Sequence, residues 1–323
     1  MTRATKVCLI VAASAILLGL IIIGGVMTVL KWDFTALSTS KLVTNEHDVN
    51  EPFDRITVIT DTADVRFVLS EGETGQVVCY EEAKARHAVS VRDGALEIRL
   101  TNEKAWYDYI GISFGSPKLT VYLPRADYAS LTVKGRTGDI EIPQEFTFES
   151  IGVSVSTGDV TCRASATGDV TLTTSTGDID VADMAAAALV LSVSTGDITA
   201  SHVTCGGDVT VGVSTGKAYL AHVTCQNLLS NGNTGDLALK RVVATERFSI
   251  ARSTGDVKLD ACDAAEIHIQ TDTGDVTGSL TSEKVFITKT DTGRVEVPTT
   301  TAGGRCEITT DTGHIKVKIL PNG

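Results

Sequence analysis

The sequence has little positive charge: 28 lysine and arginine residues stand against 40 aspartate and glutamate residues, giving a formal net charge of −12. A protein that binds nucleic acid needs a basic face, so this balance argues against a nucleic-acid partner. It also argues against docking on an anionic membrane surface through charge.

Helical periodicity and a disulfide framework are missing as well. Outside the N-terminus, apolar residues almost never recur at a helical period, and Thr, Ser, Val, Gly and Asp dominate, which is typical of β-strands joined by frequent turns. The seven cysteines show no framework spacing. The composition therefore indicates an all-β fold.

The motifs of common catalytic sites are absent too. The sequence contains no Ser-His-Asp ordering, nucleophile elbow, glycine-rich phosphate loop or metalloprotease helix. We therefore expect no enzymatic activity, and with it no catalytic residues, no cofactor and no small-molecule substrate.

One long apolar run is present, near the N-terminus. Residues 7–30 carry no charge, and at 1.5 Å per residue such a helix spans a hydrocarbon core of ~30 Å. A secretory signal has an apolar core of only ~7–15 residues, so we expect a single-pass transmembrane helix, with a cleaved signal as the alternative. Arg3 and Lys6 precede the run, whereas Lys31 and Asp33 nearly cancel after it. This predicts a cytoplasmic tail over 1–6 and an extracytoplasmic C-terminal domain, although unpaired cysteines are uncommon in exported proteins.

A Thr-Gly-Asp phrase, or a close variant, recurs along the C-terminal two thirds of the chain. Successive glycines of the phrase are 19 or 20 residues apart: Gly138, Gly158, Gly177, Gly196, Gly216, Gly235, Gly255, Gly274, Gly293 and Gly313. Such a period predicts stacked units that cannot bury their apolar faces alone. Apolar residues flank each glycine in pairs of period two, which indicates about three short strands per coil. We expect a single-stranded parallel β-helix, a β-solenoid of about 19–20 residues per coil.

The pattern divides the chain into five parts. After the tail and the transmembrane helix we expect a polar stalk over 31–52, a β-rich capping domain over 53–130 and the solenoid over 131–323. The clearest hairpin lies at residues 89–98, where apolar residues alternate on both sides of Asp93-Gly94. In the last coil, Lys316, Lys318 and Pro321 are predicted to protect the open edge of the stack from aggregation.

The repeated corners are the first candidate site. Glycine permits a sharp corner, and the aspartate side chain can bond the backbone of the turn. The residues assigned to this role are Gly138, Asp139, Gly158, Asp159, Gly177, Asp178, Gly196, Asp197, Gly235, Asp236, Gly255, Asp256, Gly274 and Asp275. Stacked carboxylates also suit a calcium ladder, but Lys217, Arg294 and His314 occupy the same corner. We therefore expect turn formation and no metal.

Two further groups of residues are candidates. His202-Val-Thr-Cys205 is repeated as His222-Val-Thr-Cys225, which resembles a zinc site or a disulfide, but strand alternation places His and Cys on opposite faces. Trp106, Tyr107, Tyr109 and Phe114 gather aromatic rings within nine residues. Aromatic residues dominate binding hot spots, so this segment is our candidate contact site; the alternative is a loop that covers the core of the capping domain.

The repeat also resembles a known family. Arg136-Thr-Gly-Asp-Ile140, Ser156-Thr-Gly-Asp-Val160, Ser194-Thr-Gly-Asp-Ile198 and Ser253-Thr-Gly-Asp-Val257 are similar to the T-G-D-[IV] repeats of the bacterial "putative adhesin" family of unknown function, over roughly residues 50–320. Leu119-Thr-Val-Tyr-Leu-Pro124 and Leu131-Thr-Val are similar to the beginning of its repeats. The resemblance implies a membrane-tethered, surface-displayed β-solenoid, sometimes linked to envelope-stress regulation. It supplies no catalytic residues.

These observations favour a non-enzymatic adhesion or interaction scaffold at the cell surface, with envelope polysaccharide or a membrane protein as its partner. The alternative is an envelope-stress sensor or regulator that acts through a membrane partner. A carbohydrate-active β-helix enzyme is the third hypothesis, and the short coils argue against it because they build no groove wall.

Overall fold

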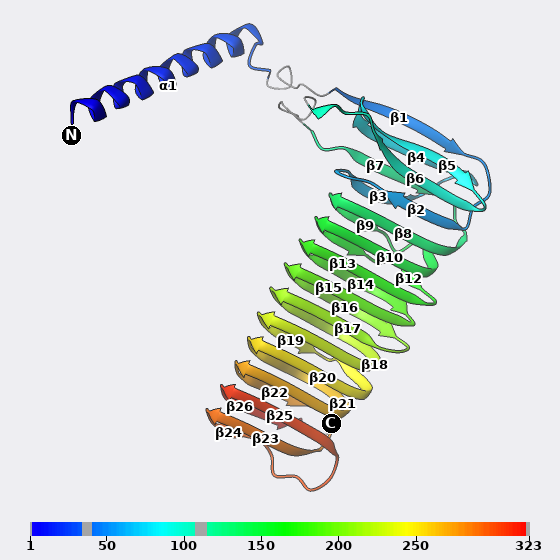
Figure 1. Ribbon diagram of the computed structural model, residues 1–323. Helices are drawn as coiled ribbons and strands as arrows, with labels where there is room; N and C mark the ends of the chain where they lie inside the picture. The colour runs from blue at the N-terminus through cyan, green and yellow to red at the C-terminus, as the bar shows by residue number, and fades with distance from the viewer. Residues whose placement is uncertain (1, 34–40, 107–114, 321–323) are drawn as a thin grey trace.

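The computed structural model describes residues 2–33, 41–106 and 115–320. Helix α1 (Arg3–Val29) begins after Thr2, whose side chain accepts a hydrogen bond from the backbone N–H of Thr5 at 3.3 Å. Its most apolar window has a mean hydropathy of 2.9 and is not buried against the rest of the chain (Figure 1). Among the described residues it is the one helix long and apolar enough to cross a membrane, a property shared by anchors and signal sequences.

Two stacked sheets form the cap that precedes the repeats. Its strands are β1 (Leu42–Val49), β2 (Arg55–Ile59), β3 (Asp64–Leu69), β4 (Gly75–Glu82), β5 (Ala85–Arg92), β6 (Ala95–Asn102) and β7 (Lys118–Leu123). One sheet follows the order β5–β6–β2 and the other the order β1–β4–β7–β3. The first strand, β1, falls in the segment that the sequence pattern assigned to a polar stalk, and it pairs with β4 along its whole length.

The β5–β6 hairpin is confirmed in its predicted register. Val89 lies opposite Ile98 and Val91 opposite Leu96, around a two-residue loop. Asp93 and Gly94 form that loop with φ values of 49° and 74°, the two positive angles that a type I′ turn requires.

The remaining strands form the predicted β-solenoid. They are β8 (Asp127–Thr137), β9 (Ile140–Ile142), β10 (Thr147–Thr157), β11 (Val160–Cys162), β12 (Ser165–Ala166), β13 (Asp169–Thr176), β14 (Ile179–Ala186), β15 (Ala188–Thr195), β16 (Ile198–Cys205), β17 (Val209–Thr215), β18 (Ala218–Thr234), β19 (Leu237–Lys240), β20 (Val243–Thr254), β21 (Val257–Thr273), β22 (Val276–Leu280), β23 (Lys284–Thr292), β24 (Val295–Glu296), β25 (Gly304–Thr312) and β26 (Ile315–Ile319). β2 pairs with β8 and β3 with β9, so the two sheets of the cap continue into the coils without a break (Figure 1).

Each coil is stacked on its neighbour in parallel register. Leu172 lies beside Leu191, and Leu191 beside Val211, so partners are one repeat apart. In five coils a second corner divides the strand after the glycine corner, because one residue there adopts a left-handed conformation with φ of 51–55°: Asp183, His202, His222, Arg241 or Ala261. The pairing of β14 with β16 skips Asp183 and His202. Such a coil therefore holds three short extended segments, as the apolar pattern predicts.

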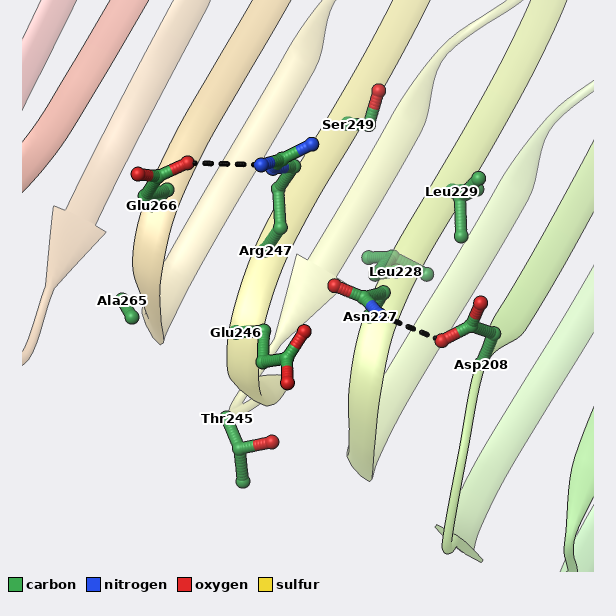
Figure 2. Close-up of a pocket in the computed structure, with 10 residues that line it drawn as sticks. All are labelled: Asp208, Asn227, Leu228, Leu229, Thr245, Glu246, Arg247, Ser249, Ala265 and Glu266. Atoms are coloured by element: carbon green, nitrogen blue, oxygen red, sulfur yellow. Dashed lines mark hydrogen bonds and ion pairs between the residues drawn. The ribbon is translucent and has the colours of Figure 1, made fainter.

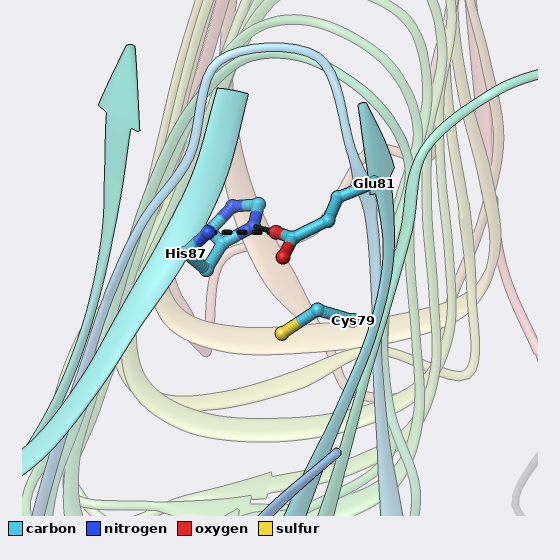
Figure 3. Close-up of side chains that lie close together, drawn as sticks. All are labelled: Cys79, Glu81 and His87. Carbon is cyan, nitrogen blue, oxygen red and sulfur yellow. Dashed lines mark hydrogen bonds and ion pairs between the residues drawn. The ribbon is translucent and has the colours of Figure 1, made fainter. Parts of the chain in front are cut away.

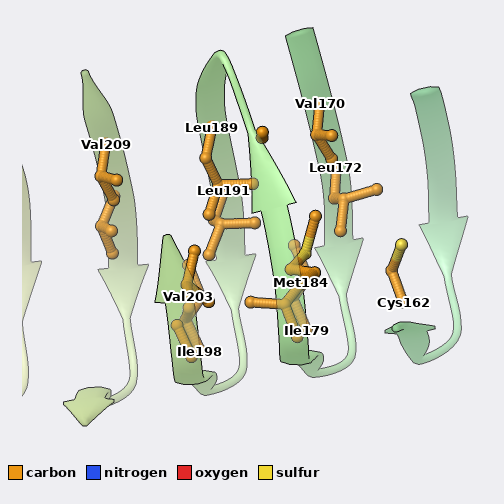
Figure 4. Close-up of a cluster of buried hydrophobic side chains, with 14 of the residues drawn as sticks. Cys162, Val170, Leu172, Ile179, Met184, Leu189, Leu191, Ile198, Val203 and Val209 are labelled. Atoms are coloured by element: carbon orange, nitrogen blue, oxygen red, sulfur yellow. The ribbon is translucent and has the colours of Figure 1, made fainter. Parts of the chain in front are cut away.

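The core runs through the inside of the stack. In Figure 4, Val170, Leu172 and Leu189 from one face point toward Ile179 and Met184 of the other. All five are at most 3% exposed. Complete burial of such side chains contributes about 1.5–3 kcal/mol each, repeated coil after coil. Stability is therefore spread along the rod rather than concentrated in one place.

An aromatic cluster joins the cap to the first coils. Tyr128 lies 6.0 Å from Phe53 and 5.6 Å from Phe148 between ring centroids, and Phe146 packs against the same ring at 6.5 Å. The hydroxyl of Tyr128 donates a hydrogen bond to the carbonyl of Pro124 at 2.7 Å, which satisfies its polar end. Three of these rings are fully buried, so the joint between cap and solenoid is rigid.

The coils at the far end do not follow sequence order. β25 pairs with β21 on one side and β23 on the other, and β26 lies in the same way between β22 and β24. The coil of residues 304–319 is thus inserted between two earlier coils, and β23 and β24 form the outer edge (Figure 1). The expectation that Lys316 and Lys318 protect an open edge is wrong, because β26 has partners on both sides and Lys316 Nζ lies 2.8 Å from Glu296 Oε2 of the neighbouring strand.

Two glycines make room for this insertion. A Cβ on Gly303 would lie 1.9 Å from the carbonyl oxygen of Glu283, and one on Gly304 would lie 1.8 Å from that of Ala265. Any side chain would collide with both flanking coils. The inserted coil can therefore approach closely enough to make its backbone hydrogen bonds.

Candidate functional site

The glycine corners stack in a column along the rod. Nine of the ten corner glycines have φ between 128° and 156°, a region that other residues rarely adopt. A Cβ on Gly177 would lie 2.2 Å from the carbonyl oxygen of Gly158, so the corners also approach too closely for any side chain. Glycine is required here by two separate constraints.

The corner aspartates bond the backbone of the next coil. Oδ1 of Asp139 accepts the amide N–H of Asp159 at 2.9 Å, and Asp159 and Asp178 repeat the contact toward the following coils at 2.8 and 2.7 Å. Asp64 begins this ladder in the cap, and Asp236, Asp256 and Asp275 continue it. Each of these carboxylates already accepts a hydrogen bond from a backbone N–H, which suits a structural role in the turn.

The exceptional residues in this column are explained by the same bonds. The amide of Lys217 still donates to Asp197 Oδ1 at 2.7 Å, because only a backbone N–H is needed on the receiving side. At His314 the acceptor is ring nitrogen Nδ1, which takes the amide of Arg294 at 3.0 Å. The lysine side chain has no hydrogen-bond acceptor. Within the described ladder, the backbone N–H of Asp236 therefore has no side-chain acceptor at Lys217.

The histidine and cysteine pairs separate onto opposite faces. The rings of His202 and His222 stack at 4.9 Å on the outside, where His202 Nδ1 lies 3.6 Å from Asp183 Oδ1. Partial burial, then the charges of His202, Arg241 and Lys240, lower the pKa of His222. Cys205 and Cys225 are buried at 5% and 3% exposure, and all seven cysteines are free thiols. The two types of side chain do not converge on one site.

The aromatic segment is described only in part. Trp106 is 76% exposed at the end of the cap. Tyr107, Tyr109 and Phe114 lie outside the described residues. The candidate contact site therefore stays a prediction from the sequence.

A groove on the outside of the solenoid was not predicted. It has a volume of about 560 Å³ and crosses four coils, each of which contributes the residue eight positions before its corner glycine (Figure 2). We call this column, continued by one further coil, the polar strip; it consists of Asp208, Asn227, Arg247, Glu266 and Arg305. The shared repeat position is the sequence signal for this column, since the strand alternation points all of these side chains outward, but the contacts between them arise only when the coils stack.

Hydrogen bonds order the side chains of the polar strip. Asn227 Nδ2 donates to Asp208 Oδ1 at 2.7 Å, and Arg247 Nη2 donates to Glu266 Oε2 at 3.1 Å (Figure 2). A second hollow of about 220 Å³ continues past Arg305 and Glu307, which are joined at 2.8 Å. The strip thus presents one neutral amide and charges of both signs at the spacing of the coils.

A buried polar cluster lies inside the cap. Cys79, Glu81 and His87 are at most 5% exposed, and Glu81 Oε2 lies 2.7 Å from His87 Nδ1 (Figure 3). Burial, then the charge of Glu81, raises the pKa of the Cys79 thiol to about 12. The sequence analysis missed this group, because its members become neighbours only when β4 and β5 face each other.

Comparison with known proteins adds a family and several solved structures. The family described as Toastrack DUF4097 matches residues 53–213 and 206–322. No curated protein matches the chain. A "putative lipid binding protein" from Parabacteroides distasonis is 16% identical, with 86% of this chain and 98% of that one covered and a TM-score of 0.46. A "putative adhesin" from Bacteroides fragilis is 15% identical, with 88% and 99% covered and a TM-score of 0.39.

Proposed function

This chain belongs to the Toastrack DUF4097 family, and we propose that it acts as a non-enzymatic interaction scaffold displayed outside the membrane. The observation that carries the proposal is the polar strip. It repeats hydrogen-bonding and charged side chains from coil to coil, about 4.8 Å apart, so weak contacts to a repetitive or extended partner add up. The family description names no enzymatic activity.

The N-terminal helix supports attachment to a membrane. Helix α1 has the length and hydropathy of a membrane span. In our proposal it stays uncleaved, and the positive residues Arg3 and Lys6 hold the N-terminus in the cytoplasm. The solenoid then extends into the envelope, where wall polysaccharide and membrane proteins are the available partners.

Binding tests this proposal directly. The full chain in lipid nanodiscs serves as bait for two envelope fractions of its host, the insoluble wall polysaccharide and the solubilised membrane proteins, each with and without calcium. We expect saturable retention that falls at least tenfold in the double variant Arg247→Gln/Glu266→Gln. A Trp106→Ala/Tyr107→Ala variant tests the aromatic segment separately.

A matched control comes from the other face of the same coils. Lys258 is exposed on β21 away from the polar strip, and Lys258→Gln should bind as the wild type does. Equal retention by all variants would refute the role of the strip.

One observation favours the alternative, an envelope regulator. A Cβ added to Gly19, Gly24 or Gly25 of α1 would meet no atom within 4 Å, so the helix offers surfaces on which a second helix can pack closely. In that case a chain without residues 41–323 would keep its membrane partner in a crosslinking experiment, whereas a scaffold would lose all binding.

A further inference from the structure

The strongest unassigned feature is the buried cluster in the cap. Cys79 and Glu81 occupy alternate positions on β4 and point inward, and His87 points toward them from β5 in the facing sheet (Figure 3). One ligand atom from each residue, a sulfur, a carboxylate oxygen and an imidazole nitrogen, lies within 4.8 Å of the other two. Sulfur, nitrogen and oxygen together are the donors that zinc prefers in proteins.

The residues around the cluster hold the ligand atoms in place. Asn45 Nδ2 donates to Glu81 Oε1 at 2.7 Å, and Thr60 Oγ1 lies 3.0 Å from His87 Nε2. With Nε2 bonded to the threonine, Nδ1 is the nitrogen that faces Glu81 and Cys79. Metal-binding histidines and carboxylates in proteins are held by the same kind of second contact on their far side.

The charges of the cluster also suit a divalent cation. A thiolate and a carboxylate together balance Zn²⁺, so a filled site with a neutral imidazole carries no net charge in the core. Ligand atoms around zinc lie roughly 3.3–3.8 Å apart, as Zn–S of ~2.3 Å and Zn–N of ~2.0 Å require. Glu81 Oε2 and His87 Nδ1, now 2.7 Å apart, would separate and the thiol would approach, each by roughly 1 Å or less, to reach that spacing. The metal would replace the thiol proton and the proton of the Glu81–His87 hydrogen bond, and both protons would be released to solvent.

An opening to solvent adjoins the cluster. A cavity of about 170 Å³ is lined in part by Thr60, Glu81 and His87, with Glu82 and Lys104 at its side. Lys104 Nζ lies 2.6 Å from Glu82 Oε2. The cavity gives a metal ion a route to the carboxylate and the imidazole, and it leaves space for a water molecule beside them.

We propose that Cys79 Sγ, the Glu81 carboxylate and His87 Nδ1 bind one Zn²⁺ ion, with water as the fourth ligand. The ion joins the two sheets of the cap at the end of the solenoid. His202 and His222 offer no equivalent site, because the cysteines of their repeats point into the core.

Cobalt substitution tests this proposal on the full chain in detergent micelles. After removal of metals with a chelator, one equivalent of Co²⁺ should produce the near-ultraviolet charge-transfer band of a cobalt–thiolate bond. We expect Cys79→Ser to abolish the band and His87→Gln to weaken cobalt binding at least tenfold. Zn²⁺ should displace the cobalt with a stoichiometry of one and raise the unfolding temperature.

Two variants serve as controls. Cys162 is another fully buried thiol, and Cys162→Ser should keep the band unchanged. His222→Ala removes the exposed histidine pair and should leave the stoichiometry at one. Absence of the thiolate band in the folded wild-type protein, or its persistence in Cys79→Ser, would overturn the proposal. A variant that fails to fold is replaced by Glu81→Gln, which keeps a carbonyl oxygen for the backbone N–H of His87 and should still lower zinc affinity.

Discussion

Arg252 is an exceptional residue of the solenoid core. Its guanidinium is 3% exposed and makes one hydrogen bond, from Nη2 to Ser230 Oγ at 2.7 Å, while Nε and Nη1 are buried without a partner among the described residues. Burial lowers its pKa. The position three residues before the corner glycine holds threonine in four other coils, at Thr174, Thr271, Thr290 and Thr310, and glycine or valine in the rest. Thr174 and Thr271 each donate to the carbonyl of a neighbouring corner glycine. The unpaired donors of Arg252 thus lower the stability of the protein, whereas the hydroxyls of Thr174 and Thr271 find acceptors.

The variant Arg252→Thr should therefore stabilise the protein. It removes two unsatisfied buried donors and supplies a hydroxyl that can donate to the carbonyl of Gly235, while the lost packing next to Gly232 offsets part of the gain. We expect a net increase of about 1 kcal/mol in the free energy of unfolding, measured by urea denaturation followed by circular dichroism. The exposed Arg247→Thr should change it by less than about 0.5 kcal/mol. A destabilised Arg252→Thr would show that the guanidinium has a partner in solution.

The corner ladder gives a second prediction at the scale of the residue. Asp178→Ala leaves the amide of Asp197 without its acceptor, which should cost about 0.5–1.5 kcal/mol. Asp178→Asn keeps a carbonyl oxygen in the same place and should recover most of that loss. Hydrogen exchange of the Asp197 amide measures the effect locally, and equal exchange in both variants would contradict it.

At the scale of the element, the inserted coil depends on Gly303 and Gly304. Gly304→Ala places a methyl group against the backbone of Ala265, so β25 cannot keep its distance from β21. We expect a loss of about 1–3 kcal/mol and faster hydrogen exchange in β23–β26. Gly206→Ala is the matched control, because nothing lies within 4 Å of the added group.

An ion pair stabilises the same region. Lys284 is 3% exposed, its Nζ lies 2.7 Å from Asp263 Oδ1, and it also bonds Ser282 Oγ. Burial acts to raise the pKa of Asp263, but the bonds from Lys284 and Ser282 outweigh it and the pKa lies below its usual value of 3.8.

A lowered folded-state pKa fixes the sign of the pH dependence. The ion pair stabilises the folded protein fully at a pH above the pKa that Asp263 has in the unfolded chain, about 3.8. This stabilisation is lost as the pH falls further, through the lower pKa that Asp263 has in the folded protein. We expect exchange in β23 to accelerate in this range in the wild type. Asp263→Asn should exchange faster at neutral pH and show a smaller acid response. An identical acid response in both proteins would contradict this assignment.

At the scale of the whole molecule, most of the fold follows from the repeat. The corner glycines and the alternation of apolar residues fix the coil length and the inward faces, because only one register buries both. The order of the last coils does not follow, since all coils share the same pattern and the close approach that Gly303 and Gly304 allow is visible only in the structure. Strand β1 was not expected from the sequence for a related reason: its inward positions include Asn45 and His47, whose polar side chains hide the strand pattern that the pairing with β4 reveals.

The candidate sites divide in the same way. The glycine corners, and the placement of His202 and Cys205 on opposite faces, follow from local repeat and strand patterns. Such patterns can be recognised in the sequence. The polar strip and the cap cluster depend on contacts between coils or between facing sheets, so residue types alone do not reveal them. Charged residues of the strip, such as Arg247 and Glu266, look like ordinary surface residues until stacking brings them together.

The inserted coil has a consequence for how the chain is made. A ribosome produces residues 284–296 before residues 304–319, yet the later segment must lie between the earlier one and the rest of the rod. Growth at this end therefore cannot proceed by adding each coil as it emerges. Until the later segment is available, β23 and β24 have either no neighbour or the wrong one, since β21 presents a similar edge. The segment of residues 304–319 must therefore dock on β21 and β22 before β23 and β24 reach their final partners, and the time this takes governs how long that edge stays exposed to other chains.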